Sequence, residues 1–269
     1  MRIVVRGKRW KTFSLRFLRD FEFMTQSKYL PILSIFAFLI FWFGLAVFLQ
    51  SRLFPSPEIV ARVLWQQCES GELPYHLGVT LLRLVVSFTI SMLLGCGIGI
   101  ALGRSEKLNA FFDNWLIIFL NIPALVTIIL CYVWFGLNES AAILAVILNK
   151  VPNVIVTLRE GTRALDKELL NMAKCYQFSR MKTLRHVILP QLHPFLMSAT
   201  RSGLALIWKI ILMVELLGRS NGMGYQLHLF FQWFDIASIL AYTVAFVSVI
   251  QALEFWMLKP LDNRALKWR

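Results

Sequence analysis

Long apolar runs alternate with shorter polar segments over most of this chain. Six runs approach or exceed the ~20 residues that a helix needs to cross a bilayer. They are Pro31–Gln50, Leu82–Gly103, Trp115–Phe135, Ala141–Leu158, Met197–Gly218 and Ile236–Leu258. Backbone groups in lipid must be satisfied within the segment, so we expect helices, and the continuity of the runs disfavours a β-barrel. The pattern predicts an all-α polytopic membrane protein with about six transmembrane helices.

Polar residues inside these runs are the first candidates for function, because charges in a membrane usually face a cavity or a partner. The set comprises Asn121, Asn149, Lys150, Lys209 and Glu215. Lys209 and Glu215 lie about 240° apart around a helix, so they are not expected to pair with each other. Lys150 and its neighbours suggest a break in the fourth run. The set fits either a lined, gated pathway or contacts between helices.

Composition and charge agree with a membrane protein and set its orientation. The 269 residues are 58% hydrophobic and 16% charged, with a mean hydropathy of +0.64, which is too apolar for a soluble domain. Lys and Arg gather before the first run, after the second and fourth runs, and after the last. By the positive-inside rule, both termini are cytoplasmic. This topology accounts for most of the +13 net charge, so no nucleic-acid partner is expected.

The same pattern divides the chain into three parts. Residues 1–30 form a basic cytoplasmic segment, residues 31–258 form the transmembrane domain, and residues 259–269 form a basic cytoplasmic tail. Within the domain, residues 159–196 make one long cytoplasmic loop.

Motifs for chemistry are absent from the sequence. It has no G-x-x-x-x-G-K-[ST] loop for ATP, no G-x-S-x-G and no H-E-x-x-H. The four cysteines have no suggestive spacing, and the four histidines are predicted on different sides of the membrane. We therefore expect no catalytic site, no metal and no cofactor on this chain. An energy source would be an ion gradient or another subunit.

Glycines recur every four residues in the second run, at Gly95, Gly99 and Gly103. Small residues at this spacing let a second helix approach closely. The pattern predicts helix packing, either inside one subunit or between two.

A polar, basic insert, Asn171–Pro190, interrupts the apolar pattern. It carries Lys174, Arg180, Lys182 and Arg185 and ends in Ile-Leu-Pro. The insert is either a docking element for a cytoplasmic partner or a solvated loop that follows the positive-inside rule.

Short motifs around the runs resemble the permease subunits of ABC importers, the binding-protein-dependent transport inner-membrane components. Leu53–Pro57 resembles an L-P-S-P motif, Trp134–Gly136 matches W-F-G, and Gly222–Tyr225 resembles G-L-G-Y. The likeness runs from about Leu53 to Arg269 and is strongest to the branch for nitrate, sulfonates, taurine, bicarbonate and thiamine precursors.

The resemblance identifies the insert as the EAA loop, which couples a permease to its ATPase. Ala173, Leu189 and Pro190 stand at the family spacing, whereas Asn171 replaces the usual Glu and Gln177 the usual Gly. The implied coupling residues are Asn171, Ala173, Lys174, Gln177, Ser179, Arg180, Leu189 and Pro190. Helical spacing would put positions 173, 177, 180 and 184 on one face, with Ala173 against the partner and Pro190 ending the helix.

The resemblance also implies a setting. The fold would be that of a type I ABC importer permease in a bacterial inner membrane. The partners would be two cytoplasmic ABC ATPases that hold ATP and Mg, a second permease copy or homologue, an external substrate-binding protein and membrane lipid. The cargo would be a small solute, with an anion favoured, and the chain would not be an enzyme.

Two other functions stay open on the residues alone. A gradient-driven secondary transporter would use Glu215 as its ion-sensitive carboxylate. A membrane-embedded enzyme or scaffold would need reactive residues at one depth. Only the importer requires a bound ATPase.

Overall fold

The structure is a computed structural model that describes residues 30–51 and 53–258, and this part of the chain consists of helices joined by short turns, without strands. The all-α prediction is therefore confirmed, while the predictions for residues 1–29 and 259–269 lie outside the described residues. The elements are α2 (Leu30–Leu49), α3 (Pro57–Glu69), α4 (Glu72–Arg104), α5 (Glu106–Asn121), α6 (Ala124–Phe135), α7 (Glu139–Arg163), α8 (Lys167–Cys175), α9 (Arg180–Thr183), η1 (Leu184–Ile188), α10 (Leu189–Gly218), α11 (Met223–Gln232), α12 (Ile236–Leu253) and η2 (Glu254–Leu258).

The chain forms two compact units, Met1–Ala61 and Arg62–Arg269. In the first, α2 presents mostly exposed apolar side chains over 20 residues, which is about 30 Å of helix and suits a bilayer core. Within α2, the Trp42 indole N–H donates to the Pro55 carbonyl (3.1 Å) and ties this helix to the turn that leads to α3.

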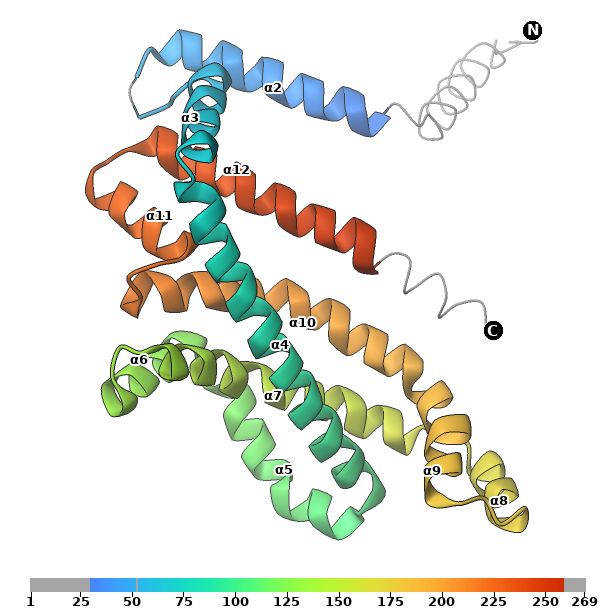
Figure 1. Cartoon of the computed structure of the whole chain (residues 1–269). Helices are drawn as coiled ribbons and strands as arrows, with labels where there is room; N and C mark the ends of the chain where they lie inside the picture. Colours follow the sequence, from blue (N-terminus) through green and yellow to red (C-terminus); the bar gives the residue numbers. More distant parts are fainter. Residues whose placement is uncertain (1–29, 52, 259–269) are drawn as a thin grey trace, which may run out of the picture. The chain divides into compact units, whose positions relative to one another are not determined.

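In the second unit, α4, α7 and α10 pack along one another and form the core (Figure 1). The three glycines of the predicted stripe, Gly95, Gly99 and Gly103, lie against α7, at Val154, Leu158 and Thr162 in turn. Each position thus faces the residue 59 further along, so α4 and α7 run in the same direction. A Cβ at Gly99 would lie 2.8 Å from the Ile155 carbonyl oxygen, so this contact requires glycine. The glycine stripe packs inside one subunit.

By length and apolarity, four described helices can cross a membrane: α2, α4, α7 and the segment Ile236–Trp256. The third predicted run is not one straight helix, because α5 and α6 meet at 95°. Pro123 cannot continue a helix, and it holds Ile122 in an extended conformation. The two helices together would make a fifth span. The fifth predicted run lies in α10, which has 30 residues but carries three charges within Arg201–Gly218.

The expected break in the fourth run is wrong. Helix α7 is continuous over 25 residues, with Pro152 buried inside it. The Asn149 side-chain amide turns back and donates to the Ala145 carbonyl (2.8 Å), so this polar group is satisfied within the helix.

Candidate functional site

The insert forms two helical pieces rather than the single helix expected. Helix α8 ends at Cys175, and a new helical run begins at Arg180 and continues through η1 into α10. Positions 173 and 180 therefore belong to different helices. Pro190 does not end a helix but lies in the first turn of α10. Just before Pro190 the helix has one π-type turn, in which the Leu189 N–H donates to the Leu184 carbonyl five residues earlier.

The end of α8 explains the family's glycine. The Phe178 N–H donates to the Ala173 carbonyl (2.9 Å) and the Gln177 N–H to the Lys174 carbonyl (3.0 Å). This is a Schellman motif, whose C′ residue is left-handed and usually glycine. Gln177 occupies that position with φ +50°, a conformation that is strained for a residue with a Cβ. The substitution changes backbone strain as well as adding a side chain.

Helix α8 is anchored on one face and open on the other. Ala173 is 1% exposed, so it packs on its own chain. The sequence had instead suggested that Ala173 contacts a partner. The Asp166 N–H donates to the Gln191 side chain (2.8 Å), which ties the start of α8 to α10. The adjoining side of the helix, about 40–100° around from Ala173, bears exposed apolar side chains, here called the α8 apolar face: Leu169, Met172 and Tyr176.

The remaining predicted coupling residues lie in α8, in the turn after it and in the helical run that follows. Asn171, Lys174, Arg180, Leu189 and Pro190 are all exposed. Ser179 caps α9 by accepting a hydrogen bond from the Lys182 N–H (3.3 Å). The structure thus exposes these loop residues but turns Ala173 inward.

A buried ion-pair cluster closes the opposite end of the bundle, where α4 and α7 begin and α10 ends. Arg83 is 3% exposed, and its guanidinium reaches Glu215 through Nη1 (2.7 Å) and Glu139 through Nε (2.6 Å) and Nη2 (2.9 Å). Arg219 binds Glu139 from the other side (2.8 Å). Two arginines and two glutamates therefore compensate one another, and they connect α4, α7 and α10.

Glu215 is fully buried, and short elements satisfy its remaining oxygens. Thr80 Oγ1 and the Gly224 N–H both donate to it at 2.9 Å. Gly222 has φ +107°, and a Cβ there would collide with the Glu215 carboxylate. The G-x-G spacing after α10 is thus explained by the approach of the backbone to Glu215. This residue makes an interhelical contact, as one of the two interpretations of its sequence required.

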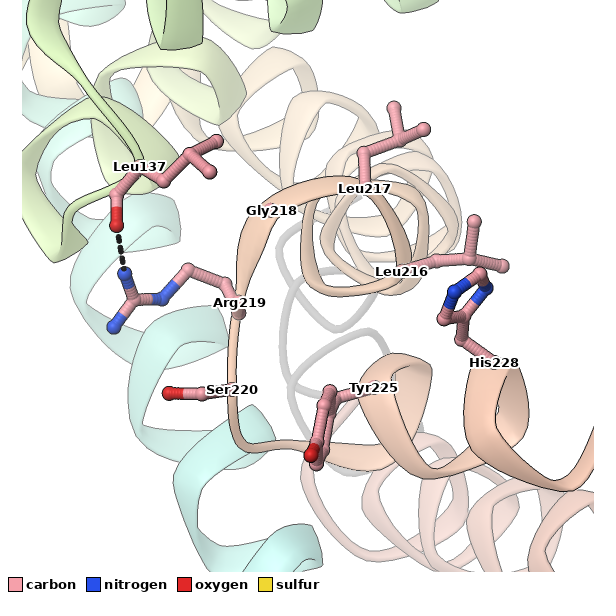
Figure 2. Close-up of a pocket in the computed structure, with 8 residues that line it drawn as sticks. All are labelled: Leu137, Leu216, Leu217, Gly218, Arg219, Ser220, Tyr225 and His228. Carbon is pink, nitrogen blue, oxygen red and sulfur yellow. Dashed lines mark hydrogen bonds between the residues drawn. The ribbon is translucent and has the colours of Figure 1, made fainter. Parts of the chain in front are cut away.

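A pocket of about 410 Å³ opens beside this cluster (Figure 2). Figure 2 shows the Arg219 guanidinium turned toward the Leu137 carbonyl, to which it donates (2.9 Å), while Tyr225 and His228 rise from α11. Because these polar groups do not converge on one point, the pocket has no defined centre for a ligand.

The other polar residues of the predicted pathway lie apart. Asn121 is exposed and donates to the Ile117 carbonyl (2.7 Å) of its own helix. Lys209 is also exposed and lies over the Trp208 ring, 5.6 Å from its centroid. Lys150 is 1% exposed and lies against Gly203 of α10. The structure does not gather this set into one site.

Arg83 was missed as a functional candidate on the sequence. It lies at the second position of a predicted apolar run, so the cost of an intramembrane charge could have identified it. Its partner Glu215 is 132 positions away in the chain, and no local spacing relates the two.

Comparison with known proteins places these features in context. Residues 91–264 match the family model described as binding-protein-dependent transport system inner membrane component. The chain is 34% identical over 177 residues to SsuC of Escherichia coli (strain K12), covering 66% of this chain and 67% of that protein. It is 28% identical over 226 residues to SsuC of Bacillus subtilis (strain 168), covering 84% and 81%. Both relatives are named as transport permeases for aliphatic sulfonates.

The fold is also similar to a solved transporter. A chain from inward-facing conformations of the MetNI methionine ABC transporter superposes with a TM-score of 0.57 at 18% identity, covering 76% of this chain and 96% of that one. At this identity the likeness concerns the fold alone.

Proposed function

This chain belongs to the family of binding-protein-dependent transport inner-membrane components, and from this premise we propose how it couples an ATPase to the import of a small organic anion. It is a multi-pass permease of an ABC importer and is not itself an enzyme. Such a permease works with an ATPase and a substrate-binding protein. The coupling surface, the cargo and the orientation below are our proposals.

The α8 apolar face is the docking surface for the ATPase. The observation that carries this assignment is the exposure of Leu169 (41%), Met172 (39%) and Tyr176 (73%) on a short helix outside the apolar runs. Spacings of three, four and seven put these side chains on one helical face. In water such a face favours burial against a groove, and the exposed Lys174 adds charge at its rim.

The connection from α8 into the membrane is stiff. Ala173 and the bond from Asp166 to Gln191 fasten α8 to its own chain. The helical run that follows continues from Arg180 to Gly218 and ends beside Glu215. Helix α10 alone spans about 45 Å at 1.5 Å per residue. A displacement of α8 by the ATPase would therefore move α10 as a lever.

Docking is tested on the reconstituted complex. Met172→Glu and Tyr176→Ala should reduce both copurification of the ATPase and substrate-stimulated ATP hydrolysis, because each removes apolar contact at the docking face. Tyr75→Ala is the matched control, since Tyr75 is 57% exposed but lies in the first turn of α4 at the other end. ATPase binding and stimulation at wild-type levels in both α8 variants would contradict the assignment.

The orientation places α8 in the cytoplasm and α11 outside, following the excess of Lys and Arg in the loop that holds α8. Two exposed native cysteines provide a test: Cys175 at the end of α8 and Cys68 in α3. An impermeant thiol reagent applied to spheroplasts should label Cys68 and spare Cys175. Labelling of Cys175 before the cells are lysed would reverse the topology.

The assembly and cargo follow the family and the named relatives. Two permeases would join two ATPases, with ATP and Mg held on the ATPases and an external binding protein delivering the cargo. The SsuC relatives are named for aliphatic sulfonates, which supports a small organic anion as the solute. Uptake of ethanesulfonate by proteoliposomes that contain the whole complex tests this class.

A further inference from the structure

The seam where α4, α7 and α10 meet contains polar groups without partners. The register between α4 and α7 puts Ser91 beside Lys150, one turn from the contact of Gly95 with Val154. Ser87 lies one turn closer to the start of α4, level with Val146. Ser87 and Val146 line the same narrow void. Lys150 lies one residue from the middle of α7, and Gly203 lies at the middle of α10. These groups therefore occupy the central depth of the bundle.

None of the three polar side chains is satisfied. Ser87 and Ser91 are fully buried, and neither hydroxyl has a hydrogen-bond partner within the described part of the chain. Lys150 is 1% exposed and has no acceptor or carboxylate among the residues that the structure describes. The void beside Ser87 is too narrow for a water molecule, so solvent does not satisfy the hydroxyl there. An uncompensated buried ammonium is costly, particularly in a membrane.

The carboxylates of the buried ion-pair cluster do not compensate Lys150. Glu215 and Glu139 are committed to Arg83, which borders the void beside Ser87. The Lys150 side chain is 1% exposed and lies between α7 and Gly203 of α10, so a counter-charge would reach it along the seam between these helices.

We propose that Lys150, Ser87 and Ser91 form an intramembrane subsite for a small organic anion with a sulfonate or carboxylate head group. The ammonium supplies three donors and each hydroxyl supplies one, which matches a compact group rich in acceptor oxygens. This subsite rests on the proposed function and adds to it a contact site for the cargo within the membrane.

The same helices show how the subsite opens. The glycine contacts hold α4 and α7 together, and α10 passes close to Lys150 at Gly203, where a Cβ would lie 2.9 Å from Lys150 Cε. Helix α10 is pinned to α4 at Glu215 and is joined to α8 at its other end. Movement of α8 thus swings α10 about Glu215 and separates Gly203 from Lys150, which admits the anion.

Thiol labelling tests the subsite without relying on transport. Ser91→Cys is placed in a chain whose four native cysteines are replaced, and the whole complex is reconstituted with its ATPase and supplied with Mg-ATP. The probes are anionic 2-sulfonatoethyl methanethiosulfonate and its cationic trimethylammonium analogue. Each rate is divided by that reagent's rate with free 2-mercaptoethanol. We expect the anionic reagent to react about tenfold faster than the cationic one, because a site of one charge concentrates the opposite ion.

Matched lysine variants decide whether Lys150 causes this preference. Lys150→Met should bring the ratio to about one, a loss of about tenfold, and Lys150→Arg should retain most of the preference. Lys209→Met is the control, because that lysine is exposed over Trp208 and lies outside the seam. If Ser91→Cys does not assemble, Ser87→Cys reports on the same seam from one turn away on α4.

Three results would overturn the subsite: a cysteine that neither reagent reaches during ATP turnover, a ratio near one in the parent, or a ratio unchanged by Lys150→Met. A Lys150-dependent preference in a complex that takes up no ethanesulfonate would support the subsite and contradict the proposed cargo. Ethanesulfonate uptake with no such preference would support the cargo and contradict the subsite.

Discussion

The two ends of the α4–α7–α10 bundle differ in how they are held together. At the α11 end, two arginines and two glutamates compensate one another around Glu215, which is fully buried. At the α8 end, a short helix with an open apolar face is followed by a strained glutamine and a π-type turn. Buried ion pairs resist separation because a charge left alone is costly, whereas short exposed helices open at low free energy. The first end suits an anchor and the second a movable contact.

The largest effect should come from breaking the anchor. Arg83→Met leaves Glu215 charged, buried and unpaired, so we expect the free energy of unfolding to fall by about 3–5 kcal/mol. Thermal unfolding of the purified permease in detergent measures the loss. Arg163→Met is the matched control, since its pair with Glu160 is largely exposed and contributes at most about 1 kcal/mol. Equal losses in the two variants would remove the distinction between the ends.

The glycine contact between α4 and α7 should respond next. Gly99→Ala places a Cβ against the Ile155 carbonyl and should destabilise the protein by about 1–3 kcal/mol. Alanine is therefore expected to be destabilising here, although its small side chain alone would suggest a mild replacement. Gly97→Ala provides the control in the same helix, because a Cβ there has no neighbour within 4 Å. Thermal unfolding in detergent measures the stability of both glycine variants. If Gly99→Ala is as stable as the wild type, α7 can move away from α4 to accept the extra Cβ.

The smallest effect concerns the strain at the α8 end. Gln177→Gly relieves the left-handed conformation and should stabilise the end of α8 by about 1 kcal/mol, seen as slower limited proteolysis of the insert. Gln177→Ala keeps the strain and removes only the side chain. If substrate-stimulated ATP hydrolysis falls in both variants, the Gln177 side chain makes a specific contact. If it falls only in the glycine variant, the strain itself is needed for coupling.

Local patterns in the amino-acid sequence were enough for the helical architecture, because apolar runs and small-residue spacing act within one element. The runs around Leu82–Gly103 and Ala141–Leu158 correspond to α4 and α7, whereas the insert is helical in two pieces instead of the one helix expected. Only the bend at Pro123 divided a predicted run into two helices.

Which residues of different helices meet depended on how the helices pack, and residue spacing along the chain does not predict this. Arg83 meets Glu215 across 132 positions, and Ala173 turns inward because α8 folds back on its own chain. Lys150 carries the same charge as other lysines in the sequence, but the meeting of three helices removes it from solvent and from every described acceptor. Burial is a property of the whole packed bundle, so the tertiary structure alone distinguishes this lysine from Lys209, which stays exposed.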